Sequence, residues 1–273
     1  MNAPSEESYP GLRLEKDGPI LVCRFDDAAY APDVHNSIAR FASAIGTDRD
    51  VRVVVVTGTG SVFNRGGNVK KFASGETDTP ALVLRSFETH KEHNGFADVP
   101  QPTISMINGD AIGGGLAFAL QCDILVAADT ARIGFAYSKI GLSPSSPLLA
   151  LTPLLTGFNF VKEYVFTGEL IPAREAERIG LVNHVYPAAE LERETMRLAG
   201  RIAAASPVSQ RFAKLILNKE AKQRLAALGP ECEALLALTA DMADHEEGKR
   251  AFVEHRKPEF PGFRDPTLRR KQS

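Results

Sequence analysis

The chain has 273 residues and a mass of 29.5 kDa, which is enough for one domain with an extensive core or for one domain with a small addition. Hydrophobic residues make up 44% and charged residues 24%, as in an ordinary globular protein and unlike a disordered one. Because 32 Lys and Arg nearly balance 34 Asp and Glu, the net charge of -2 provides no field that would hold a nucleic acid or an anionic membrane. Any anionic ligand must therefore be held locally.

Cysteine usage predicts a reducing compartment. Cys23, Cys122 and Cys232 are odd in number and far apart, which suits neither a disulfide framework nor a metal site, and no H-E-x-x-H or C-x-x-C spacing occurs. The polar start MNAPSEESYPG lacks the features of a signal peptide, and every apolar run is interrupted before 18 residues. We expect a cytoplasmic protein that binds no metal and no membrane.

Short β-branched runs alternate with helical patterns in the first two thirds of the chain. The runs predicted as buried strands are 20–25, 51–57, 103–108, 122–128 and 181–186. Helices are expected at Asp33 to Ile45, at Pro80 to Phe96, and between Pro172 and Gly180. This alternation predicts an α/β fold with parallel strands.

After about residue 188 no strand pattern remains. Helical patterns cover Leu191 to Ala205, Val208 to Leu225 and Cys232 to Glu246. Such a region has too little core of its own, so it is expected to pack on the first part of the chain or on another subunit. We divide the chain into a core at residues 1–198 and a helical oligomerisation region at residues 199–273.

Two glycine clusters follow predicted strands. Gly113, Gly114 and Gly115 open a helix that is expected at Leu116 to Gln121, where free N–H groups can cradle an anion; equally, the glycines can serve only to pack a helix tightly. A second pair lies in GTGSVFNRGGNVKKF. Two strand ends that each offer one backbone N–H form the arrangement that holds a carbonyl oxygen as it becomes negative.

Four ordered segments extend this pattern over residues 10 to 262. They are VRVVVVTGTGSVFNRGGNVKKF, PTISMINGDAIGGGLAFALQCDILVAADTARIGFAYSKIGLSP, VFTGELIPAREAERIGLVNHVYP and EGKRAFVEHRKPEFPGF. In this order they resemble the enoyl-CoA hydratase/isomerase (crotonase) superfamily. The resemblance implies an α/β spiral of ββα turns with a C-terminal helical trimerisation region, assembled as a homotrimer or a dimer of trimers. It also implies an acyl-CoA thioester substrate, with no cofactor beyond the CoA moiety.

The resemblance also implies roles for individual residues. The two N–H donors of the family's oxyanion hole correspond to Gly67 and Gly114. Because a donor needs only its backbone amide, glycine at position 67 in place of the usual alanine is not expected to matter. The CoA contacts correspond to the loop of Arg65, Gly66, Gly67, Asn68 and Val69; Lys70, Lys71 and Arg256 or Lys257 are candidates for the CoA phosphates or are simply solvated charges.

The sequence departs from the family at the acid/base positions. Hydratases of the family carry glutamates at the positions of Ala117 and Tyr137. A methyl group transfers no proton, and a phenol with an ordinary pKa of about 10 is a poor base at neutral pH but a usable donor. The remaining candidates are Ser145 and His90, which fall at positions that related dehalogenases of aromatic acyl-CoAs use for an aspartate and a histidine.

We therefore expect an enzyme that stabilises an enolate or a tetrahedral oxyanion of an acyl-CoA, with Gly67, Gly114, Tyr137, His90 and Ser145 as the catalytic candidates. The expected reaction is decarboxylation, C–C cleavage, isomerisation or thioester hydrolysis. Two alternatives stay open: a hydratase or isomerase with its base elsewhere in the fold, and a catalytically silent acyl-CoA-binding subunit.

Overall fold

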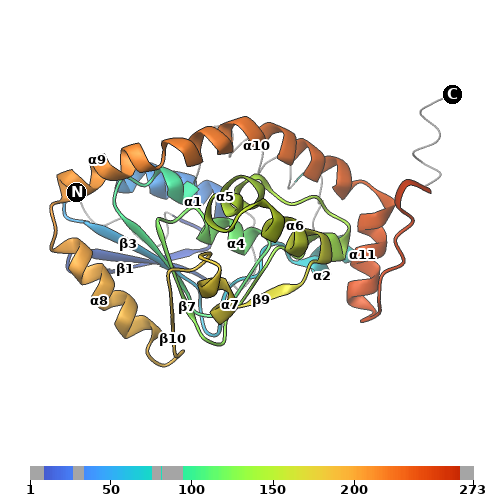
Figure 1. Cartoon of the computed structure of the whole chain (residues 1–273), viewed down its shortest axis with the longest axis horizontal. Coiled ribbons are helices and arrows are strands. Elements are labelled where there is room, and N and C mark those ends of the chain that lie inside the picture. The colour runs from blue at the N-terminus through green and yellow to red at the C-terminus, as the bar shows by residue number, and fades with distance from the viewer. Residues whose placement is uncertain (1–8, 27–33, 76–80, 82–94, 265–273) are drawn as a thin grey trace.

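A computed structural model describes residues 9–26, 34–75, 81 and 95–264. In this part of the chain, a six-stranded sheet forms the larger layer (Figure 1). Its spatial order is β1 (Leu12–Asp17), β2 (Ile20–Phe25), β3 (Val53–Thr57), β5 (Thr103–Ile107), β7 (Ile124–Ala128) and β10 (His184–Tyr186). β1 and β2 pair antiparallel, and all the other neighbours are parallel. The predicted α/β architecture with parallel strands is confirmed.

Burial on both faces explains why the inner strands β2, β3, β5 and β7 are mostly apolar, whereas the edge strand β1 is mostly exposed and of mixed polarity. The four valines Val53 to Val56 of β3 are completely buried, as a strand covered on both sides requires. All five predicted strands are present, although β3, β7 and β10 begin two or three residues later than the apolar runs suggested.

A second, four-stranded sheet was not predicted. It contains β4 (Val62–Asn64), β6 (Asp110–Ile112), β8 (Arg132–Gly134) and β9 (Leu170–Pro172), of which β8 and β9 pair antiparallel. β4, β6 and β8 each follow a strand of the first sheet after a few residues, so the chain passes repeatedly from one sheet to the other. Helical segments follow each passage, which gives the repeated ββα turns that the family resemblance implied.

Helices connect the strands and cover the sheets. They are α1 (Val34–Ile45), α2 (Val69–Ala73), α4 (Gly114–Ala119), α5 (Ser146–Thr156), α6 (Phe158–Thr167) and α7 (Ala173–Arg178), with short 3-10 turns η2 (Gly95–Asp98), η3 (Tyr137–Ile140) and η4 (Gly262–Arg264). The helices predicted from Asp33 and after Pro172 are confirmed as α1 and α7. α4 begins at Gly114, two residues earlier than predicted. Most of the helix predicted at Pro80 to Phe96 lies outside the described residues.

The C-terminal region is helical, and the first of its predicted helices is confirmed as α8, but the predicted boundaries of the later helices were wrong. α8 (Leu191–Ala203) and α9 (Pro207–Leu217) are followed by α10 (Lys219–Ala240) and α11 (Ala243–Val253). The predicted helices at 208–225 and 232–246 left a break around Pro230, yet α10 passes through this proline and the breaks fall near Asn218 and Asp241. α8 also runs across the predicted division at residues 198 and 199, which stays a prediction.

α10 and α11 bring the C-terminal region back onto the core of the same chain. In Figure 1, α10 spans the molecule from α9 to α11, and it packs against α5. α11 packs against α2 and η3; there a Cβ on Gly248 would collide with the backbone of Ile140, so this approach requires a glycine. At the other end, the buried ammonium of Lys214 on α9 donates to Asp123 Oδ2 at 2.6 Å and to the carbonyl oxygen of Gln101 at 2.8 Å.

Candidate active site

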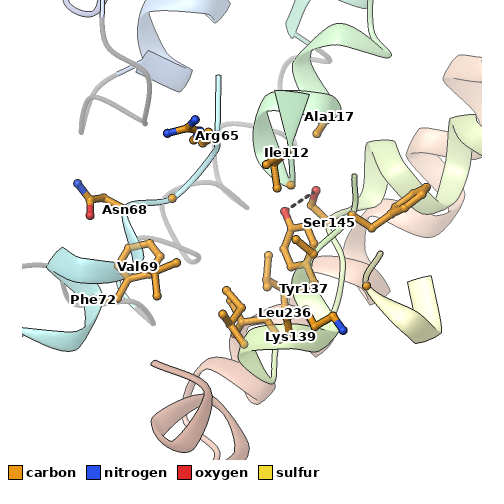
Figure 2. Close-up of a pocket in the computed structure, with 18 of the residues that line it drawn as sticks. Arg65, Asn68, Val69, Phe72, Ile112, Ala117, Tyr137, Lys139, Ser145 and Leu236 are labelled. Atoms are coloured by element: carbon orange, nitrogen blue, oxygen red, sulfur yellow. Dashed lines mark hydrogen bonds between the residues drawn. The ribbon is translucent and has the colours of Figure 1, made fainter. Parts of the chain in front are cut away.

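A cavity of about 590 Å³ lies where these segments meet (Figure 2). The loop from β4 to α2, with Arg65, Asn68, Val69 and Phe72, forms one side of the view, and Tyr137, Ser145, Lys139 and Leu236 lie opposite. Ile112, at the end of β6, and Ala117, on α4, lie above Tyr137 and Ser145 in this view. Four separate parts of the sequence therefore converge on one mostly apolar cavity.

The β4–α2 loop is held against the beginning of α4 by backbone contacts. Asn64 is buried at the end of β4, and its Oδ1 accepts the N–H of Gly66 at 2.8 Å. Gly66 has φ of 74°, and a Cβ there would lie 2.9 Å from the Gly114 nitrogen. Glycine is thus required both by the left-handed backbone and by the close approach. As a result, the segments that carry Gly67 and Gly114 lie side by side.

The three glycines of the triplet have different surroundings. Gly113 has φ of 56°, and its N–H donates to the carbonyl oxygen of Gly134 at 2.8 Å. Gly115 packs so closely on β4 that a Cβ would collide with the carbonyl oxygen of Asn64. Gly114 is the first residue of α4, so its N–H has no acceptor within the helix. Tight helix packing therefore explains Gly115, while Gly114 lines the cavity.

Gly67, the other predicted donor, also lines the cavity. Among the described residues its N–H has no hydrogen-bond acceptor, whereas the N–H of its neighbour Gly66 is occupied by Asn64. A Cβ on Gly67 would lie 2.5 Å from Cζ of Phe72, so the ring fills the space that an alanine methyl group would take. The backbone amides of Gly67 and Gly114 thus both lie at one cavity, and neither has a hydrogen-bond acceptor within the part of the chain that the structure describes.

Ala117 and Tyr137, the residues at the family's glutamate positions, both line the cavity. Ala117 is 5% exposed on α4. The Tyr137 hydroxyl donates to Ser145 Oγ at 3.2 Å, as the dashed line in Figure 2 shows. Burial, together with the nearby charge of Glu233, raises the pKa of Tyr137 to about 12, although the hydrogen bond to Ser145 acts in the opposite direction. At neutral pH the phenol keeps its proton and can donate it.

The predicted CoA-contact residues are only partly brought to the cavity. Arg65, Asn68, Val69 and Lys70 line it, as does Lys139. The Arg65 guanidinium donates to Asp110 Oδ2 at 2.9 Å, and Arg132 donates to the same carboxylate, which fixes the direction of the Arg65 side chain. These two arginines hold the pKa of Asp110 below its ordinary value, with the hydrogen bond from Arg132 as the largest cause.

Other predicted residues have different positions. Gly66, Lys71 and Lys257 are not among the residues that line the cavity, and Lys257 is exposed. The guanidinium of Arg256 is bound to the carboxylates of Glu247 and Glu254. His90 lies outside the described residues. The roles of all these residues therefore stay predictions.

Several residues that line the cavity were not predicted from the sequence. They include His35 on α1, Phe72 on α2, Gln121 after α4, and Glu233 and Leu236 on α10. Glu233 is 2% exposed, and it is the single carboxylate among the described lining residues. No local sequence pattern distinguishes Glu233, because its position in the cavity wall depends on the long helix α10 crossing the core of the same chain.

Within residues 9–26, 34–75, 81 and 95–264, no three His, Cys, Asp or Glu side chains gather as a metal ion would require. No helix in these ranges has the length and apolar character to cross a membrane.

Comparison with known proteins relates this arrangement to one family. The family model described as enoyl-CoA hydratase/isomerase matches residues 32–263. The putative enoyl-CoA hydratase/isomerase YngF of Bacillus subtilis is 32% identical over 238 residues, which are 86% of this chain and 90% of that protein. The mitochondrial methylglutaconyl-CoA hydratase of Homo sapiens is 30% identical over 271 residues, covering 94% of this chain and 78% of that protein.

A solved structure shows the same fold. The crystal structure of an enoyl-CoA hydratase from Mycobacterium avium subsp. paratuberculosis K-10 superimposes with a TM-score of 0.80 at 26% sequence identity. The superposition covers 92% of this chain and 99% of the chain in the crystal structure. The predicted fold, an α/β spiral core followed by C-terminal helices, is confirmed, with two mixed sheets forming the core.

Proposed function

Since the chain belongs to the enoyl-CoA hydratase/isomerase family, we propose that it binds an acyl-CoA thioester and polarises the thioester carbonyl with the amides of Gly67 and Gly114. The negative oxygen of an enolate or of a tetrahedral intermediate would be held between these two N–H groups. Preorganised donors of this kind contribute about 10² to 10³ in rate each. The observation that carries the proposal is the close approach of Gly66 to Gly114, which brings both amides to one cavity.

The reaction we propose is not a standard hydration. Syn-addition of water by a glutamate pair needs two carboxyl groups, and the corresponding positions hold the methyl group of Ala117 and the phenol of Tyr137. Tyr137 is a proton donor at neutral pH because burial raises its pKa to about 12. Decarboxylation, C–C cleavage, isomerisation and thioester hydrolysis fit this set of residues. Ser145 and His90 remain candidates for hydrolysis.

Two assays test this proposal against its alternatives. Turnover of crotonyl-CoA at ordinary hydratase rates, followed by loss of the enoyl absorbance, would show a hydratase with a base from elsewhere in the fold. Calorimetry with CoA and a panel of acyl-CoAs tests the third possibility. Tight binding without turnover of any member would indicate a silent acyl-CoA-binding subunit, and absence of CoA binding would contradict every acyl-CoA function.

The surroundings of the cavity support a place for CoA. Arg65, Lys70 and Lys139 are the cations among the described lining residues, and they suit the phosphates of CoA. The cavity wall is otherwise mainly apolar, as an acyl chain requires. No further cofactor is part of the proposal.

We also propose that the protein assembles as a homotrimer or as a dimer of trimers. α9 carries a set of exposed apolar side chains whose exposed fractions range from 59% to 77%: Val208, Phe212, Leu215, Ile216 and Leu217. Contiguous exposed apolar side chains of this size mark association surfaces. Light scattering during gel filtration should give three or six times the chain mass, and a monomer would contradict the proposal. The three cysteines are free and buried, which supports a cytoplasmic location.

A further inference from the structure

Glu233 on α10 is a buried carboxylate in the wall of the cavity. Its exposed fraction is 2%, whereas Glu231, two residues earlier on the same helix, is exposed. Glutamates are rarely buried to this extent unless they are paired or functional. The wall around Glu233 includes the apolar side chains of Leu236 and Phe252, which lower the local polarity.

The carboxylate is positioned by the first residue of α5. Its Oε1 accepts hydrogen bonds from the backbone N–H of Ser146 at 3.4 Å and from the Ser146 hydroxyl at 3.3 Å. The preceding residue, Ser145, accepts the Tyr137 hydroxyl at 3.2 Å. Tyr137, Ser145 and Glu233 are therefore polar groups in the wall of a mostly apolar cavity, and Ser146, which follows Ser145 in the chain, holds the carboxylate.

Tyr137 and Glu233 also interact electrostatically. The negative charge of Glu233 is one of the causes that raise the pKa of Tyr137, after burial. The pair thus combines a phenol that keeps its proton with a carboxylate that can accept one. These are complementary groups for moving a proton on and off a substrate.

We infer that Glu233 is the base that removes a proton from the carbon next to the thioester carbonyl. The inference rests on the proposed acyl-CoA function and assigns the proton transfer of that same site. The C2–H bond breaks, its proton passes to the Glu233 carboxylate, and its electron pair forms the C1–C2 double bond of an enolate. The negative charge moves onto the thioester oxygen between the amides of Gly67 and Gly114. Return of the proton from Glu233 to carbon restores the carbonyl.

A purely structural role for Glu233 gives different expectations. As the acceptor for Ser146 it anchors α10 to α5, and a glutamine at this position keeps an acceptor oxygen for the same hydrogen bonds. Glu233→Gln therefore removes the base while it leaves the anchor in place. Glu231→Gln makes the same change of charge at an exposed position of the same helix and is the matched control.

The test is exchange of the C2 protons of butyryl-, hexanoyl- and phenylacetyl-CoA with D₂O, followed by NMR. The wild-type protein and Glu231→Gln should exchange at least one of the three, and Glu233→Gln should exchange it at least about 100-fold more slowly with an unchanged melting temperature. If Glu233→Gln does not fold, Glu233→Asp serves instead, with slowed but measurable exchange expected.

The outcomes separate the two proposals. Exchange at the wild-type rate in folded Glu233→Gln would overturn the role of Glu233 and leave the oxyanion site intact. No exchange of any of the three by the wild-type protein would overturn the enolate function together with the role of Glu233. Equal slowing in Glu231→Gln would also overturn the role of Glu233, because the effect would then follow helix charge and not the base.

Discussion

The contact between Gly115 and β4 gives the sharpest test of how the site is built. Within a helix, Gly→Ala ordinarily stabilises by up to about 1 kcal/mol, because alanine has the higher helix propensity, and Gly115 is the second residue of α4. At Gly115, however, the added Cβ would lie too close to the carbonyl oxygen of Asn64. The distance between them would be more than about 1 Å shorter than the 3.0 Å below which real Cβ contacts essentially do not occur. Since this neighbour is backbone, Gly115→Ala must push α4 and β4 apart.

The size of the loss in activity depends on the residues that α4 and β4 position. Asn64 holds the Gly66 N–H, and Gly66 lies next to Gly114, so separation of α4 from β4 moves the amides of Gly67 and Gly114 relative to each other. A displacement of about 1 Å at a reacting centre costs about 10² in rate, and loss of one oxyanion donor costs about 10² to 10³. We therefore expect kcat/KM to fall by about 10² to 10³, and overpacking to lower the free energy of unfolding by about 1 to 3 kcal/mol.

The assay combines C2-proton exchange of the acyl-CoA with thermal unfolding. Gly200→Ala, within α8, is the control, because a Cβ there meets no atom within 4 Å; it should raise stability by up to about 1 kcal/mol and leave exchange unchanged. Wild-type exchange in Gly115→Ala, with equal or higher stability, would refute the reasoning that this contact sets the distance between the two amides.

Further predictions concern the phenol and two charged networks. Tyr137→Phe should lower kcat/KM about 10-fold or more, because the proton donor is lost, whereas Tyr164→Phe, outside the cavity, should not; equal kinetics in both variants would exclude a role for the phenol. Lys214→Met should lower the free energy of unfolding by about 3 kcal/mol, because it leaves the carboxylate of Asp123 without its buried ammonium partner. Lys222→Met removes the partner of Asp98 from a more exposed pair and should lower the free energy of unfolding by less than about 1 kcal/mol. Urea titration of both variants measures the difference. Arg256 and a backbone N–H lower the pKa of Glu247 from 4.5 to about 2, so the stabilisation by this carboxylate is complete above pH 4.5 and is lost as the pH falls toward 2. The difference in melting temperature between wild type and Glu247→Gln should therefore be present at pH 7 and be much smaller at pH 2; a difference at pH 2 as large as that at pH 7 would contradict this origin.

The inner strands of the main sheet could be predicted from the sequence because they are buried on both faces, whereas the mostly exposed edge strand β1 was missed. A short run of β-branched residues such as Val53 to Val56 indicates a buried strand. The second sheet was missed because β4, β6, β8 and β9 have three residues each, which is too short for any period to be read. Their formation depends on pairing with one another across the spiral.

The helix boundaries near the C-terminus show the limit of local rules. Pro230 normally ends a helix, since it lacks an N–H and its ring collides with the preceding turn. α10 nevertheless continues through it to Ala240, and it packs along α5 over this stretch. Tertiary packing outweighed the local preference.

The residues of the candidate site that lie in sequence motifs could be predicted, whereas the residue that the path of the chain brings to the cavity was missed. Gly67, Gly114, Tyr137 and Ser145 follow strands in a fixed order, so motifs located them and the structure brings them to one cavity. Glu233 is about 100 residues farther along, and nothing in its neighbourhood in the sequence distinguishes it from other helical glutamates. Only the return of α10 over the core brings it to the cavity wall.

The proposed function requires the thioester oxygen of an acyl-CoA to lie between two backbone amides. A crystal structure with a bound non-reactive acyl-CoA analogue measures this directly. The carbonyl oxygen should lie about 2.7 to 3.1 Å from the nitrogens of both Gly67 and Gly114, with the acyl C2 facing Glu233. An acyl-CoA whose carbonyl oxygen contacts neither amide would contradict it.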